Sequence, residues 1–241
     1  MFIDAREGVS GDMLLAAMLG VLPEKERGEA IAALASACSR RAIDMSVLDV
    51  EEAGERGLSV AYVSRQHGPE GASRDEAYAA LAEVEAEIGS RSTIGRRILD
   101  AIMEAEAKAH DVPVDKVHLH EIARVQAMVN IAGIGLVHSL LEKAGHGGFS
   151  ASTITTGRGI VVVGHGAVRI PAPACRFLLE GMMHQPGDSP GERATPVGVA
   201  AVKVLSSRQT DDIPASPLAR SVGFGTRRFG GRLGRVAVIR A

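Results

Sequence analysis

A chain of 241 residues with 46% hydrophobic and 23% charged residues has an ordinary globular composition and is long enough to bury a sizeable core. A formal net charge of −2, 3% aromatic residues and no Trp argue against nucleic-acid binding, by charge or by aromatic stacking. Cys38 and Cys175 form no CxxC pair, and neither a leader pattern nor an 18-residue apolar run is present. We therefore expect a cytoplasmic protein with no disulfide, no membrane partner and no nucleic-acid partner.

The first half of the chain alternates strand and helix patterns. The predicted elements are a strand at residues 2–5, a glycine turn at 8–12, helices at 13–22 and 24–39, and a hairpin of strands at 47–52 and 58–64. Ser73 and Glu76 have the spacing of a capping box, in which the serine and glutamate side chains bond each other's backbone N–H groups. Apolar residues at helical spacing then predict a helical hairpin insertion at about residues 71–112, ended by Pro113.

The second half contains the most apolar helical pattern, predicted at residues 121–143. Strand patterns follow it, and two further helices are expected to begin near Pro173 and at Thr195-Pro196, where a proline suits the first helical turn. Residues 207–217 are expected to form a loop before two closing strands. The predicted fold class is α/β (or α+β), a single domain over residues 1–241 with a mixed sheet, flanking helices and the helical hairpin as an insertion.

His118, His120 and Glu121 form the densest group of candidate catalytic residues. If residues 118–120 are extended, both imidazoles lie on one side, because side chains along a strand alternate with period two. Imidazole and carboxylate are transition-metal ligands, and His165, His138 or His184 would be needed to complete a site. We select His118, His120 and His165 as candidate metal ligands. The alternative, equally weighted, is a strand–helix junction whose imidazoles bond the backbone.

Ser10, Gly11 and Asp12 join a strand to a helix N-terminus, a place where backbone N–H groups can bind an anion. A plain strand–helix connection is the favoured alternative, because the turn matches neither a dinucleotide nor a Walker motif. From residue 208 onward the chain contains seven arginines and only two aspartates. Among them, Arg227 and Arg228 follow a glycine turn that could bind phosphate through its backbone amides and the guanidinium groups. A solvated basic face is at least as good an interpretation of those arginines.

Two further features favour structural roles over chemical ones. Gln126 and Asn130 are four residues apart and share a helix face, but neutral amides are weak ligands for a hard cation. Cys175 follows a Pro-Ala-Pro turn in the first turn of a helix, which can lower a thiol pKa, yet no base partner is evident.

Five short motifs, taken together, resemble a known family. In chain order they are Ile3-Asp4 with Gly8-Val9-Ser10-Gly11-Asp12-Met13, His118-x-His120-Glu121, Gly157-x-Gly159 through Pro171-Ala172-Pro173-Ala174, Gly191-Glu192 with Thr195-Pro196-x-Gly198, and Gly223-x-Gly225-x-Arg227. The motifs and their order, over nearly the whole chain, resemble those of the N-terminal domain of the nickel-insertion proteins. Those proteins mature the nickel-pincer cofactor of lactate racemase.

The resemblance implies insertion of nickel into a pyridinium bis-thiocarboxylate mononucleotide, driven by CTP with a divalent metal. It also implies that the domain associated with CTP lies outside these 241 residues, on a C-terminal continuation or a separate partner chain. Two helix aspartates of the family correspond here to Gln126 and Asn130, and its Gly-Ala pair to Ala123-Arg124.

Three functional hypotheses follow from the motifs and the departures. The first is a divergent nickel-pincer-type enzyme, a chelatase-like lyase of cofactor or natural-product biosynthesis acting on a pyridinium nucleotide-like substrate. The second is a non-catalytic relative that binds a nucleotide or a partner. The third is a metal-independent enzyme using His118 or His120 as acid or base. A homo-oligomer is compatible with each hypothesis.

Overall fold

The computed structural model describes residues 1–65, 71–119, 125–163 and 166–241, and it centres on a mixed sheet. The seven strands, in spatial order, are β13 (Ser206–Gln209), β6 (Phe149–Ala151), β1 (Phe2–Asp4), β15 (Arg232–Arg240), β14 (Ala219–Phe229), β3 (Glu55–Ser64) and β2 (Ile43–Glu52). β6 pairs in parallel with both β1 and β13, β14 pairs in parallel with β3, and the other neighbours are antiparallel. The predicted mixed-sheet α/β fold is confirmed.

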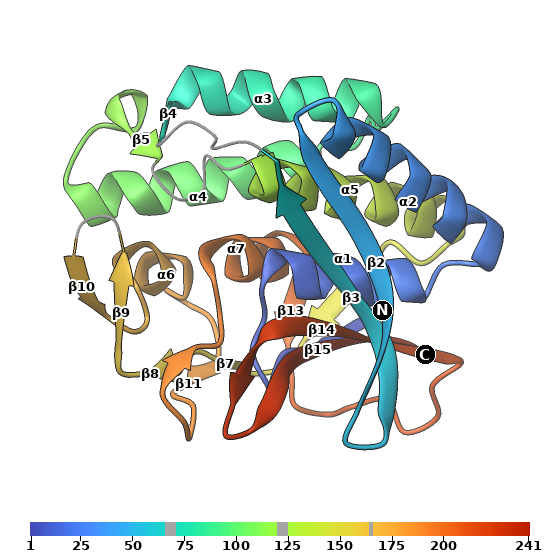
Figure 1. The fold of residues 1–241 in the computed structure, drawn as a ribbon. Coiled ribbons are helices and arrows are strands. Elements are labelled where there is room, and N and C mark those ends of the chain that lie inside the picture. Colours follow the sequence, from blue (N-terminus) through green and yellow to red (C-terminus); the bar gives the residue numbers. More distant parts are fainter. Residues whose placement is uncertain (66–70, 120–124, 164–165) are drawn as a thin grey trace.

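Helices are stacked in successive layers above this sheet (Figure 1). They are α1 (Gly11–Gly20), α2 (Glu24–Ser39), α3 (Arg74–Glu87), α4 (Ile94–His110), α5 (Val125–Lys143), α6 (Pro173–Leu178) and α7 (Pro196–Leu205). α1 and α7 lie directly on the strands. α4 packs on α7, α5 packs on both α1 and α7, and α3 packs on α5. One continuous core runs through these layers, and a small cluster of Val222, Phe224 and Ala237 lies apart from it.

Short two-stranded ribbons complete the described part of the chain. Their strands are β4 (Ala72–Ser73) with β5 (His118–Leu119), β7 (Ile154–Thr155) with β11 (His184–Gln185), β8 (Gly157–Arg158) with β12 (Gly191–Glu192), and β9 (Ile160–Val163) with β10 (Gly166–Arg169). One of them, β12, carries Glu192, which lines the candidate site described below.

α1 lies unusually close to β14 because one face of that strand carries only small side chains. Ser221, Gly223 and Gly225 alternate along the strand and therefore share one face. A Cβ built on Gly223 would overlap the carbonyl oxygen of Met13, and one on Gly225 would lie 2.9 Å from the Met13 sulfur. The close approach buries eight of the ten residues of α1.

α5 is a core helix buried on more than one side. Its buried residues include Val129 and Ala132, but also Ile131, Ile134 and Val137. By length and composition α5 could cross a membrane, yet 61% of its apolar stretch is buried inside the protein, as expected for a core helix.

The capping box at the start of α3 is confirmed, because the Glu76 backbone N–H donates to the Ser73 hydroxyl and the Glu76 carboxylate accepts from the Ser73 N–H. The second helix of the predicted hairpin, α4, packs on α5, α6 and α7 within the main core. The predicted loop after α7 is partly wrong: residues 206–209 form β13, an edge strand held by pairing with β6.

Replacing Gly223 with Ala should strongly destabilise the fold, because the new methyl group would enter the α1 backbone. We expect a loss of about 3 kcal/mol of unfolding free energy, measured by urea denaturation. Gly28→Ala is the control, since a Cβ there meets no atom within 4 Å and the residue lies inside α2. That variant should gain about 1 kcal/mol from helix propensity. Equal midpoints for Gly223→Ala and the native protein would contradict the close packing.

Candidate functional site

A cavity of about 220 Å³ lies where the N-termini of α1 and α7 meet the turn between β14 and β15. We call it the α1–α7 cavity. It is lined by Ser10, Asp12, Met13, Glu192, Arg193, Thr195, Gly225, Thr226, Arg227, Phe229 and Gly234. Segments from both ends of the chain therefore build one site.

The two helix N-termini are held together by backbone contacts. The Val9 N–H donates to the Arg193 carbonyl at 2.8 Å, and the Thr195 N–H donates to the Val9 carbonyl at 3.0 Å. Gly198, in the first turn of α7, packs directly on this segment: a Cβ there would overlap the Val9 carbonyl oxygen and lie 2.7 Å from the Ser10 Cα. A larger residue would push the helices apart.

Both helices direct the positive ends of their dipoles to this region. Ser10 and Thr195 are the N-cap residues of α1 and α7, and neither side chain caps its own helix. The Ser10 hydroxyl instead donates to the Asp12 carboxylate, which lies in the first turn of α1. An anion entering the cavity would meet two helix N-termini and the Thr195 hydroxyl.

The two arginines of the cavity have different surroundings. Arg193 is buried and forms ion pairs with Asp188 at 2.9 Å and with Glu7 at 3.5 Å. Its guanidinium carbon lies 4.7 Å from the centre of the Phe229 ring. Its charge is largely compensated within the protein. The Arg227 side chain is 66% exposed, and its ion pair with Glu192 is long, at 3.9 Å. Arg227 is therefore the arginine able to turn to a ligand.

The structure brings together most of the predicted anion-binding residues. Ser10, Asp12 and Arg227 line the α1–α7 cavity. Gly11 lies behind them, where a Cβ would be 2.6 Å from Val197 and 3.2 Å from the Asn130 Cβ. Arg228 points away, since its guanidinium donates to Glu52 and to the Gly231 carbonyl.

His118, the described residue of the histidine motif, lies elsewhere in the structure. His118 is exposed on β5, paired with Ser73 at the start of α3, and β5 is separated from the β14–β15 turn (Figure 1). His120, Glu121 and His165 lie outside the described residues. Within the described ranges, no three His, Cys, Asp or Glu residues are grouped closely enough to hold a metal ion. His138 is buried against the Gly147 carbonyl, and His184 is exposed on β11.

Asn130 takes part in a buried polar contact behind Gly11. It is 8% exposed, and the Tyr62 hydroxyl donates to its side-chain oxygen at 2.7 Å. Burial of the hydroxyl, followed by the negative charges of Cys38 and Asp12, raises the pKa of Tyr62 well above its usual value. The hydroxyl therefore stays protonated and donates to the amide oxygen of Asn130.

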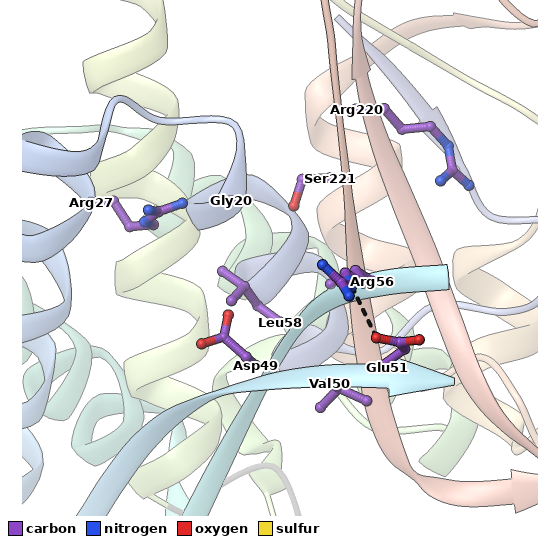
Figure 2. A pocket seen from close by; sticks show the side chains of 10 residues that line it. Gly20, Arg27, Asp49, Val50, Glu51, Arg56, Leu58, Arg220 and Ser221 are labelled. Atoms are coloured by element: carbon purple, nitrogen blue, oxygen red, sulfur yellow. Dashed lines mark hydrogen bonds and ion pairs between the residues drawn. The ribbon is translucent and has the colours of Figure 1, made fainter. Parts of the chain in front are cut away.

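Figure 2 shows a larger and more open concave surface at the opposite end of α1. Gly20, Arg27, Asp49, Arg56 and Ser221 are among its lining residues. Arg56 is paired with Glu51 at 2.9 Å, and the negative end of the α1 dipole lies here. This surface contains none of the predicted site residues and is less suited to an anion than the α1–α7 cavity.

Several residues of the α1–α7 cavity were not predicted from the sequence, notably Glu192, Arg193, Thr195 and Phe229. The sequence signal that could have indicated Thr195 is Thr195-Pro196, which marks a helix start, as Ser10-Gly11 does. Nothing in the linear sequence indicates that those two helix starts, far apart along the chain, lie side by side.

Both thiols should be unreactive in the folded protein. Burial raises the pKa of Cys38 to about 11, and burial, followed by Glu192 and Glu106, raises the pKa of Cys175 well above its usual value. The Cys175 thiol donates to the Ala194 carbonyl at 3.6 Å. At about pH 8, a disulfide reagent such as Ellman's should modify neither thiol until denaturant is added, because the thiolate is the nucleophile. Rapid modification of native Cys175 would instead support a catalytic thiol.

Comparison with known proteins supplies the family. The profile described as nickel insertion protein matches residues 1–240. Proteins named "Putative nickel insertion protein" from Rhodopirellula baltica and Pelobacter propionicus are 29% and 33% identical over 96% and 94% of this chain. The chain covers 57% and 56% of those relatives, a little over half of their length. No solved structure matches it. The chain belongs to the nickel insertion protein family.

Proposed function

We propose that this chain is the substrate-binding part of a nickel-insertion, chelatase-like protein, with the α1–α7 cavity holding a phosphate-bearing pyridinium nucleotide. Nickel is the cargo in this proposal. The observation that carries it is the convergence of two helix N-termini beside Arg227, in a chain of the nickel insertion protein family.

The mixed charge of the cavity suits such a substrate. Its lining holds two arginines and the two carboxylates Asp12 and Glu192. A phosphate would be bound by the helix N-termini, the hydroxyls of Thr195 and Thr226, and the guanidinium of Arg227. A cationic pyridinium ring would lie near Asp12 or Glu192. A purely anionic ligand would be repelled by those carboxylates.

The Ser10–Asp12 hydrogen bond would orient the carboxylate before substrate arrives. Arg193, held by Asp188, Glu7 and Phe229, would fix the loop that carries Glu192 and Thr195. These contacts pre-organise the cavity, so that less conformational freedom is lost on binding.

We propose His118, His120 and Glu121 as the segment that faces the metal or the reacting ring. CTP would act through a region beyond these 241 residues, in the same protein or a partner chain. Neither assignment adds a residue to the α1–α7 cavity, so binding there can be tested alone.

A second candidate is a relative that binds the nucleotide without inserting nickel. The observation favouring it is the Tyr62–Asn130 contact, because the Asn130 oxygen accepts a hydrogen bond and its amide nitrogen cannot coordinate a cation. At a position where the resemblance implies an aspartate, this side chain is neutral.

Arg227→Ala should weaken binding of a pyridinium mononucleotide, with nicotinic acid mononucleotide as the probe in isothermal titration calorimetry. Losing one charge-assisted hydrogen bond should raise the dissociation constant about tenfold. Arg228→Ala is the matched control, because this neighbouring arginine bonds Glu52 and does not line the cavity. Equal affinities for the native protein and Arg227→Ala would refute the assignment of the cavity.

Converting both amides to carboxylates separates the two candidate functions. In equilibrium dialysis with nickel, the double variant Gln126→Asp/Asn130→Asp should bind nickel at least about tenfold more tightly than the native chain, if the amides suppress metal binding. The single variant Gln126→Asp, which leaves the Tyr62 contact intact, serves as the control. Native nickel affinity equal to that of the double variant would exclude the non-inserting candidate.

A further inference from the structure

A separate cavity of about 490 Å³ lies at the other end of α7, between the start of α4 and the end of α5. We call it the α4–α5 cavity. Thr195 at the start of α7 lines the α1–α7 cavity, whereas Val204 and Leu205 at its end line this one. At 1.5 Å per residue, a ten-residue helix separates the two by roughly 15 Å. They are distinct sites.

Two arginines that line this cavity, Arg91 and Arg97, take part in no ion pair within the described ranges. The adjacent Arg96 differs, since it pairs with Asp100 at 3.2 Å and lies over the Tyr78 ring. Glu142 also lines the cavity, so two positive charges face one negative charge.

The N-terminus of α4 adds partial positive charge at the same place. α4 has 17 residues, carries no acidic residue in its first turn, and its N-cap Thr93 makes no side-chain capping bond. Thr93, Ser92 and Ser139 bring hydroxyl groups to the lining. Unlike the first turn of α1, which carries Asp12, the first turn of α4 holds no carboxylate.

A buried histidine is oriented toward the same cavity. His138 lines it and is 8% exposed, and its Nε2 lies 3.2 Å from the Gly147 carbonyl oxygen. That contact requires a proton on Nε2, because a carbonyl only accepts. Nδ1 has no partner among the residues that the structure describes.

We propose that the α4–α5 cavity is a second ligand site, for the phosphate group of a small phosphate monoester or for free phosphate. Arg91 and Arg97 bind the phosphate oxygens, and the hydroxyls of Ser92, Thr93 and Ser139 complete the contacts beside the α4 N-terminus, where the Ile94 N–H already donates to Ser92. His138 closes the inner wall. The site is independent of the function proposed for the α1–α7 cavity.

The test uses the full chain in a phosphate-free buffer, with glycerol 1-phosphate and inorganic phosphate as separate probes in isothermal titration calorimetry. We expect saturable binding of at least one probe, weakened about tenfold by Arg97→Gln and further by Arg91→Gln/Arg97→Gln. Arg96→Gln, one residue away but facing Asp100, should bind as the native chain does. Tighter binding of glycerol 1-phosphate would identify a monoester site, and equal binding a free-phosphate site.

Two results would overturn the proposal: no binding of either probe, or affinities that Arg97→Gln leaves unchanged. Arg227→Ala separates the two cavities. If that variant abolishes binding while Arg97→Gln does not, the phosphate occupies the α1–α7 cavity. Because Arg91 and Arg97 are exposed, their replacement should not alter the thermal unfolding midpoint, which checks that the variants are folded.

Discussion

The contact between α1 and β14 is the constraint on which the rest of the structure depends. Ser221, Gly223 and Gly225 present almost no side-chain volume, so the helix backbone rests directly on the strand. The layers above follow from this placement, because α5 and α7 pack on α1. The same contact sets the position of both ends of α1. Its N-terminus opens into the α1–α7 cavity, and its C-terminus lies at the concave surface of Figure 2.

The electrostatics of the α1–α7 cavity combine fixed and available groups. The buried Arg193 is held by two carboxylates and an aromatic ring, which suits a residue that positions the backbone of the α7 N-terminus. Arg227, in contrast, is exposed and weakly paired. A site of this kind has a rigid wall and one adaptable cation, a suitable arrangement for a ligand that carries a phosphate and a positive ring.

Family membership and local chemistry give different kinds of information about this chain. Membership rests on a match along residues 1–240 and explains the order of the motifs. The Tyr62–Asn130 hydrogen bond is a feature of this particular chain. The Asn130 side chain in it is a neutral amide, at a position where the resemblance implies a carboxylate. A protonated tyrosine hydroxyl would also donate to a carboxylate, so the surrounding structure can accept Asp at position 130.

Local chemistry determined much of this protein from its sequence alone: the mixed α/β class, the α2 boundaries, the Ser73 capping box and the helix starts at Ser10 and at Thr195-Pro196. Each depends on neighbouring residues, so the linear pattern contains it. Only the tertiary structure decided that Ser10, Thr195 and Arg227 share a cavity, that Arg228 faces Glu52, and that residues 206–209 form an edge strand. Those outcomes depend on strand pairing and helix packing between distant segments, which no local pattern specifies.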